Sequence, residues 1–176
     1  MSSVKRRGGP QLNYFLKAFR YPPEHYTGLG VEDLSGLEDV FPGKRFVQYP
    51  GGRFPFDDKA FDWVYCNAVI EHVGDDEAQV QFVNEMVRVS RNVFFTTPYK
   101  YFPVESHTNT FLLHWNNRVF YPIITKSRPW ITRESLYLFS CARLGAIMRA
   151  SNARSYTVHK NRLFGLTMTL TVVCSQ

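Results

Sequence analysis

The spacing of apolar residues changes twice between residues 61 and 98. Residues 61–70 are a mainly apolar run, which is typical of a buried strand. Residues 75–91 repeat apolar side chains at spacings of three and four, which predicts an amphipathic helix. Residues 92–98, "NVFFTTP", are β-branched and aromatic and predict a strand that Pro98 ends. Strand, helix and strand together predict a right-handed βαβ unit with parallel strands.

Shorter patterns flank this unit. The segments "HYTGLGVEDLSG" and "KRFVQYPGG" hold short apolar runs ended by acids or glycines, and each predicts a strand. Thr132 is expected to cap a helix running through "RESLYLFSCARLGAIMRA". The final run, "LTMTLTVVC", alternates apolar residues with threonines and predicts a last strand with one polar face. The predicted fold class is therefore α/β.

The chain is expected to consist of a basic appendage, residues 1–23, and one domain, residues 24–176. A short helix is predicted at "QLNYFLKAFR" in the appendage, ended by Pro22 and Pro23. The chain has 176 residues, of which 44% are hydrophobic and 20% charged. That composition is enough for one ordinary hydrophobic core.

Composition also excludes several classes of protein. No apolar run has the length of a membrane span, and no apolar segment follows the basic start, so we expect a cytoplasmic protein without a membrane partner. Cys66, Cys141 and Cys174 are odd in number and widely spaced, which predicts reduced core thiols. The net charge of +6 favours polyanions in general, but the basic residues are scattered apart from residues 5–7. Because no recognition motif accompanies them, nucleic acid is not expected as the partner.

Polar residues follow both predicted parallel strands. Asn67, Glu71 and His72 lie at the end of the first strand, and Thr97 and Tyr99 lie at the end of the second. Ligands of parallel sheets bind outside the carboxyl ends of the strands. Both sets of residues are therefore expected to border one crevice.

Two stretches of sequence resemble a known family. They are "FPFDDKAFDWVYCNAVIEHVG" and "FVNEMVRVSRNVFFTTPYKYFPVESHT", with an aromatic-Pro-Phe-Asp, a Phe-Asp that opens a strand, and Glu-His after it. In order and spacing they resemble the class I S-adenosylmethionine-dependent methyltransferases of the type 11 group, over roughly residues 27–115. The resemblance implies a Rossmann-like sheet, mostly parallel with an antiparallel last strand, and S-adenosylmethionine as cofactor.

The resemblance also implies roles for particular residues. Asp33, with Glu32 beside it, matches the acid that binds the cofactor's ribose, a role that suits a carboxylate because it accepts several hydrogen bonds. Asn67 and Ala68 match the backbone beside the methionine end of the cofactor. The alternatives are that Asp33 is a solvated loop acid or a helix cap, and that Asn67 forms a turn.

Residues 98–115 are expected to bind the acceptor. Tyr99 and Trp115 would supply aromatic walls and Glu105 a polar group, a mixture typical of small-molecule pockets, although the aromatic residues could equally cover the sheet edge. His72 and His107 are the candidate catalytic residues, because histidine can exchange a proton near neutral pH. The alternative for His72 is that the Glu-His pair only orders the loop.

Some relatives bind magnesium through a Glu three residues before the Glu-His pair. Ala68 occupies that position here, so no metal is expected.

Two family features are absent from the sequence. These are the glycine-rich turn after the first strand and the acid that reads the adenine, which should fall near Tyr49 or Pro50. The sheet is therefore expected to be N-terminally incomplete, with weak or lost cofactor binding. Either the strands in "HYTGLGVED" and "FDWVYCNAVI" close up directly, or a homodimer partner or complementing subunit covers the gap.

Two functions follow from these observations. The first is methyl transfer from S-adenosylmethionine to a small-molecule or glycan-like acceptor. The alternative is a non-catalytic remnant of the methyltransferase fold that acts as an interaction or partner subunit.

Overall fold

The computed structural model describes residues 14–175, which divide into two compact units. The first unit ends at Pro55 and the second begins at Phe56. Residues 1–13, which hold the basic part of the expected appendage, lie outside the described residues.

The first unit is built on a pair of parallel strands. Its elements are α1 (Tyr14–Ala18), a 3-10 turn (Pro23–His25), β1 (Thr27–Gly30), α2 (Leu37–Val40) and β2 (Arg45–Gln48). Both predicted strands are confirmed, and Thr27 is paired with Arg45 in a parallel register. Gly28 is needed in β1 because a Cβ there would lie 2.7 Å from the ring of Phe46.

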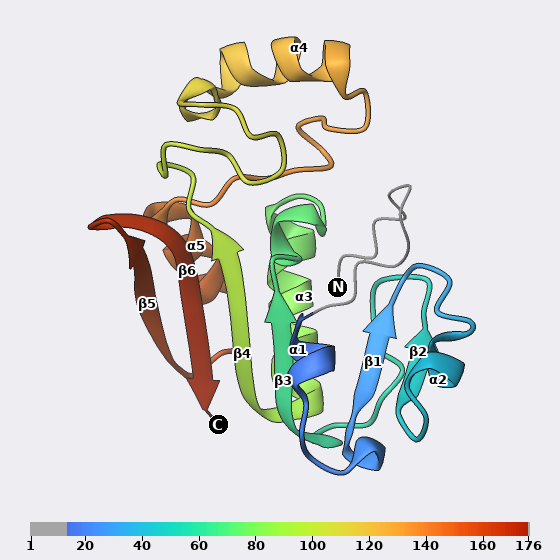
Figure 1. The fold of residues 1–176 in the computed structure, drawn as a ribbon. Coiled ribbons are helices and arrows are strands. Elements are labelled where there is room, and N and C mark those ends of the chain that lie inside the picture. The colour runs from blue at the N-terminus through green and yellow to red at the C-terminus, as the bar shows by residue number, and fades with distance from the viewer. Residues whose placement is uncertain (1–13, 176) are drawn as a thin grey trace. The chain divides into compact units, whose positions relative to one another are not determined.

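The second unit contains a four-stranded mixed sheet (Figure 1). The order of the strands is β3-β4-β6-β5; β3 and β4 are parallel, and β6 is antiparallel to both of its neighbours. The α/β fold class and the antiparallel last strand are therefore confirmed. The elements are β3 (Phe61–Asn67), a 3-10 turn (Ile70–His72), α3 (Asp76–Val89), β4 (Ser90–Pro98), a 3-10 turn (Leu113–Trp115), α4 (Asn117–Ser127), α5 (Cys141–Ala150), β5 (Ser155–Leu163) and β6 (Leu166–Ser175).

Helix α3 forms where the apolar period predicted it. Asp75 caps the helix by accepting a hydrogen bond from the backbone N–H of Ala78 at 3.0 Å. Helices α3 and α5 cover the same face of the sheet (Figure 1). The core between them and the sheet is made of buried side chains from both helices and from the two central strands: Val83, Met86, Val87, Val93, Phe95, Leu144, Ile147, Met148, Leu170 and Val172.

The helix expected from Thr132 onward is wrong in its first half. Helix α5 begins only at Cys141, where the side chain of Ser140 caps it. The residues before it form a turn at 133–135 and then an irregular segment, whose backbone bonds to other parts of the chain: Tyr137 donates to the carbonyl of Glu71, and Phe139 accepts from Lys100. These tertiary hydrogen bonds outweigh the helix propensity of the segment.

Strands β1 and β3 belong to different units and, within residues 14–175, to different sheets, so the expectation that they close up directly stays a prediction. Strand β3 pairs only with β4 in this part of the chain and forms one edge of its sheet.

All three cysteines are free, but Cys141 is only half-buried, so the expected core placement is wrong for this residue. Cys66 and Cys174 are buried in the sheet, and burial raises the pKa of the Cys66 thiol to about 12. Across residues 14–175, every helix is too short or too polar to cross a membrane.

The core of the second unit should depend strongly on Phe95, which is fully buried in the central strand β4. We expect Phe95→Ala to lower the free energy of unfolding by about 3 to 5 kcal/mol, because the truncation leaves a cavity. Phe164→Ala is the matched control: this ring is 95% exposed at the β5–β6 turn, and its loss should change stability by less than about 0.5 kcal/mol. Urea unfolding would measure both, and equal effects would contradict this view of the core.

Candidate functional site

Strands β3 and β4 end side by side. Asn67 at the end of β3 is paired with Thr96 in β4, whose hydroxyl donates to the Asn67 side-chain oxygen at 2.5 Å. One residue further, the Thr97 hydroxyl donates to Oε2 of Glu71 at 3.0 Å. The two strand ends therefore lie side by side, and that they border one crevice stays a prediction.

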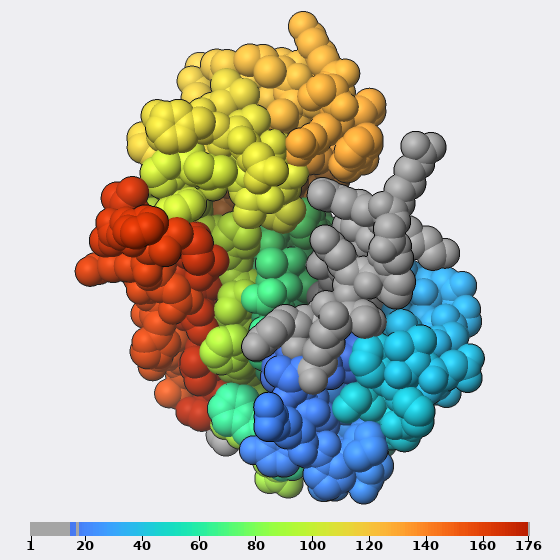
Figure 2. Space-filling model, in the orientation of Figure 1, coloured from blue at the N-terminus to red at the C-terminus, as the bar shows by residue number. Residues whose placement is uncertain are grey.

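The segment after β4 folds over this edge of the sheet. Figure 2 shows residues 100–135, in yellow and orange, as a continuous layer of atoms beyond the strand ends. Just after this layer, Tyr137 donates to the carbonyl of Glu71 at 2.7 Å, and within the layer Arg128 donates to the carbonyl of His107 at 2.6 Å. A separate apolar cluster stabilises the layer itself, made of Phe120, Tyr121, Ile124, Ile131 and Leu136.

Glu105 organises the first loop of this layer. Its buried carboxylate accepts hydrogen bonds from the backbone N–H groups of His107 and Thr108, from the Thr108 hydroxyl at 2.7 Å, and from Nδ1 of His107 at 2.6 Å. Burial alone would raise the pKa of Glu105, but the hydrogen bonds and charge of His107 and the bonds from Thr108 outweigh it and lower the pKa to about 2. Glu105 is therefore ionised at neutral pH.

His72 and His107 form a contact between their rings. Their Nε2 atoms are 3.0 Å apart, and the ring planes are nearly perpendicular at 86°. Nδ1 of His72 lies 2.9 Å from the carbonyl of Ser135, which can only accept, so this nitrogen carries a proton. Nδ1 of His107 donates to Glu105 in the same way. Both Nε2 atoms therefore face each other with one proton between them when His107 is charged.

The two rings differ in basicity. Burial opposes the charging of His107, but the carboxylate of Glu105 outweighs it and raises the pKa of His107. The pKa of His72 is lowered because surrounding protein atoms desolvate the charged ring, and the charge on His107 lowers it further. His107 thus holds the shared proton, and the pair can accept a second proton only with difficulty.

Glu71 lies beneath the histidine pair. Its side chain is 1% exposed, and burial raises its pKa. Oε2 is hydrogen bonded to Thr97, whereas Oε1 has no hydrogen-bond partner within residues 14–175 and lies 3.8 Å from Nε2 of His107. Ligand atoms of Glu71, His72 and His107 all lie within 4.8 Å of one another, so these side chains could hold a cation.

Ala68 has an unusual backbone conformation for a residue with a side chain. Its φ is +51°, in the left-handed region, and its N–H donates to the carbonyl of Thr96 at 3.0 Å. Such strained residues are concentrated at functional sites. The strain lies at the end of β3, beside Asn67, where the sequence predicted a cofactor contact.

The predicted aromatic walls lie together but apart from the histidine pair. Tyr99, Tyr101 and Trp115 form a row, with ring centroids 5.7 and 6.2 Å apart. Within residues 14–175 no hydrogen bond or ring contact joins this row to His72 or His107.

Asp33 and Glu32 lie in the first unit, just after β1. The Asp33 carboxylate accepts a hydrogen bond from the backbone N–H of Ser35 at 2.9 Å, as a turn-forming acid does. Their role with a cofactor stays a prediction.

Comparisons with known proteins bear on the fold. Residues 31–93 match the model of the methyltransferase domain family, and that stretch begins just after β1 and includes α2, β2, β3 and α3. A SAM-dependent methyltransferase from Methanosarcina mazei is similar in structure, with a TM-score of 0.54 and 16% identity over 84% of this chain and 79% of that one. The chain has the class I methyltransferase fold. The resemblance found in the sequence is thereby confirmed.

Two further solved structures share this methyltransferase fold. The N-terminal domain of EvdMO1, with SAH bound, has a TM-score of 0.50 and 14% identity over 85% of this chain and 63% of that one. A putative Zn-dependent alcohol dehydrogenase from Rhodobacter sphaeroides has a TM-score of 0.57 and 11% identity over 85% of this chain and 75% of that one. At these identities the likeness concerns the fold, which does not by itself decide the reaction. Among curated proteins no sequence matches the chain significantly.

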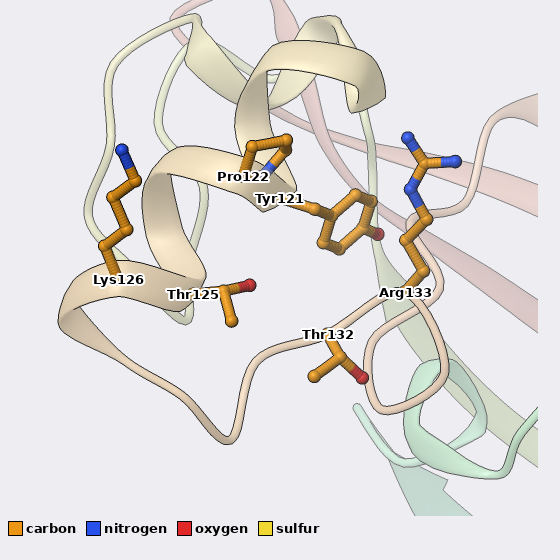
Figure 3. Close-up of a pocket in the computed structure, with 6 residues that line it drawn as sticks. All are labelled: Tyr121, Pro122, Thr125, Lys126, Thr132 and Arg133. Atoms are coloured by element: carbon orange, nitrogen blue, oxygen red, sulfur yellow. The ribbon is translucent and has the colours of Figure 1, made fainter.

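A shallow pocket of about 450 Å³ lies elsewhere in the layer that covers this methyltransferase fold (Figure 3). It is lined by Tyr121, Pro122, Thr125, Lys126, Thr132 and Arg133. The Arg133 side chain lies over the Tyr121 ring, 5.7 Å from its centroid. Because none of the histidine cluster lines it, we place the site at the strand ends and not in this pocket.

The sequence pointed to most residues of this cluster as candidates, but it did not indicate that Glu71 lies buried beneath the histidines. The Glu-His motif drew attention to His72, and Glu71 was expected only to order the loop. Glu71 is buried beside Ile70 in the 3-10 turn, and no periodic pattern in the sequence indicated that its carboxylate points inward. The contacts of Ser135 and Arg128 had no signal in the sequence, because they come from the irregular layer.

The Glu105–His107 contact should stabilise the protein in a defined pH window. Glu105 has a lowered pKa, so its contribution is present above the ordinary value of 4.5 and is lost as pH falls toward about 2. His107 has a raised pKa, so its contribution is complete below 6.5 and is lost as pH rises through the raised value. We expect the coupling to be largest between about pH 4.5 and 6.5.

A double-mutant cycle with Glu105→Gln and His107→Gln would measure this coupling, which we expect to be about 1.5 to 3 kcal/mol at pH 5.5. The exposed pair Arg91 and Asp62, 3.5 Å apart, is the control and should couple by less than about 1 kcal/mol. A coupling that does not change between pH 5.5 and 9 would show that His107 is not charged in the contact.

Proposed function

We propose that this chain transfers a methyl group from S-adenosylmethionine to a small-molecule or glycan-like acceptor. The observation that carries the proposal is the left-handed Ala68 at the carboxyl end of β3, within the stretch that matches the methyltransferase domain family. A small residue at this point lets a ligand approach the backbone closely. The histidine cluster, directly after it in the chain, supports an active site at the same edge.

Each unit holds residues that we propose as contacts of the cofactor. Asn67 and Ala68 would line its methionine end, and Asp33 or Glu32 would accept hydrogen bonds from the ribose hydroxyls. S-adenosylmethionine supplies a methyl group that is electrophilic because it is bonded to a positively charged sulfur.

The acceptor is proposed to lie against residues 99–115. Glu105 would hold His107, and the row of Tyr99, Tyr101 and Trp115 would offer flat apolar surface to a ring or sugar. When His107 is neutral, an Nε2 lone pair of His72 or His107 can accept the proton that a hydroxyl or amine acceptor loses. Apart from this proton transfer, we expect catalysis by positioning of the reactants.

The alternative, a non-catalytic interaction subunit, is supported by a different observation. Strand β3 is a sheet edge within the described residues, and the side chain of Trp63 on it is 58% exposed. Open edges with large apolar side chains are pairing surfaces. A second copy of the chain or a complementing subunit would cover this edge, in a protein that we propose to be cytoplasmic.

Cofactor binding tests the proposal most directly. This chain lacks the family's glycine-rich turn, so we expect S-adenosylhomocysteine to bind weakly, at about −6 kcal/mol or less favourably, which is tens of micromolar or weaker. Asp33→Ala should weaken binding by about 1.5 to 3 kcal/mol if the carboxylate holds the ribose. Asp39→Ala, another exposed acid of the first unit, is the control and should bind like the parent.

Calorimetric titration gives both values. Absence of any saturable binding would exclude methyl transfer by this chain and leave the interaction subunit. Nanomolar binding would show that the glycine-rich turn is dispensable here, and equal binding by Asp33→Ala would move the role to Glu32.

Strand β3 is an edge strand of its sheet in the part of the chain that the structure describes, and this predicts self-association. We expect light scattering of the purified chain to give the mass of a dimer, because an unpaired strand edge is a template for a second one. Trp63→Lys should shift the population toward monomer, since a charge on an edge strand disfavours pairing, while Phe164→Lys at the exposed hairpin turn should not. A monomer with a cooperative melt would rule out the second copy.

A further inference from the structure

One oxygen of the buried Glu71 carboxylate lacks a hydrogen-bond donor among the described residues. Its side chain is 1% exposed, and Oε1 has no hydrogen-bond donor within residues 14–175, although Oε2 has one in Thr97. Buried polar atoms are almost always paired, because leaving one without a partner costs free energy. A carboxylate oxygen without a donor is a position where a cation would be stabilised.

The two histidines point toward the same place. Each ring uses Nδ1 for a fixed partner, the carbonyl of Ser135 for His72 and the carboxylate of Glu105 for His107. Each ring therefore directs Nε2 toward the other and toward Glu71. Metal-binding histidines have this arrangement, in which the second ring nitrogen donates to a backbone carbonyl or a carboxylate.

The distances suit a small ion. Ligand atoms on a tetrahedral zinc ion lie about 3.3 Å apart, given bonds of about 2.0 to 2.1 Å. The two Nε2 atoms are 3.0 Å apart, Oε1 of Glu71 is 3.8 Å from Nε2 of His107, and all the ligand atoms lie within 4.8 Å of one another. The two pairs that include Nε2 of His107 are within about half an ångström of this spacing, and side-chain rotation of up to about 1.5 Å would bring the whole set to bonding distance.

We propose that Glu71, His72 and His107 form a binding site for a first-row transition-metal ion such as Zn²⁺, with an open coordination position. Two imidazoles and one carboxylate favour zinc and its neighbours over magnesium, which prefers oxygen ligands. The sequence predicted no metal because Ala68 stands where some relatives have a ligand. Here His107 supplies the third ligand from a separate loop, a contact visible only in the folded chain.

The open position would lie on the side where His72 is exposed to solvent. A zinc ion with three protein ligands keeps a water molecule or a substrate oxygen in its fourth position. In the metal-bound protein this position would bind the acceptor oxygen, and in the metal-free protein the Nε2 atoms would take the proton directly. The inference about the metal does not depend on methyl transfer.

Titration of the chelator-treated full chain with Zn²⁺, without any cofactor, tests the site. We expect one ion per chain and a rise in the melting temperature, since an ion that binds only the folded state stabilises it. His72→Ala should weaken binding at least about tenfold, as should His107→Ala. His159→Ala, on the exposed strand β5, is the matched control and should bind like the parent.

Two further measurements keep the result unambiguous. The metal-free melts of the parent and of His72→Ala are measured first, and if the variant still unfolds cooperatively, a loss of binding in it is the loss of a ligand and not of the fold. Co²⁺ in place of Zn²⁺ should give visible absorption bands in the parent that are absent in His72→Ala. The proposal is overturned if Zn²⁺ does not bind saturably, or if His72→Ala and His107→Ala bind it as well as His159→Ala.

Discussion

The parallel pairing of β3 with β4 is the constraint on which the site depends. Because the strands run in the same direction, the chain leaves both at the same edge of the sheet, with Asn67 beside Thr96. Glu71 and His72 then follow one strand, while the loop that carries His107 follows the other. An antiparallel pair would send these loops to opposite ends of the sheet, and the residues would not meet.

Much of this arrangement could be predicted, since it rests on local patterns. The period of the apolar residues gave the correct strand, helix and strand from residue 61 to 98, and the alternating threonines marked the last strand. The predictions were wrong where hydrogen bonds to distant segments outweigh the local preference of the backbone for a helix. Residues 133–140 look helical, yet the backbone of Tyr137 and Phe139 bonds to Glu71 and Lys100, which no local pattern shows.

The chemistry of the site could also be predicted only in part. His72 and His107 could be named as candidates because each follows a predicted strand, but the contact between their rings could not. It requires the orientation of each imidazole, which is fixed by the carbonyl of Ser135 for one ring and by Glu105 for the other. Solved structures with a similar fold are described as different enzymes, a methyltransferase and an alcohol dehydrogenase. The side chains of the site, and not the sheet, must therefore decide the reaction.

The loop around Glu105 has a consequence for how tightly the site can bind. A loop that becomes ordered only when its ligand arrives loses conformational entropy at that moment, and the affinity falls accordingly. Here the carboxylate of Glu105 already gathers the donors of His107 and Thr108 within the loop itself. The imidazole of His107 is therefore preorganised. A ligand that binds beside it does not have to order the ring, so little conformational entropy is lost on binding.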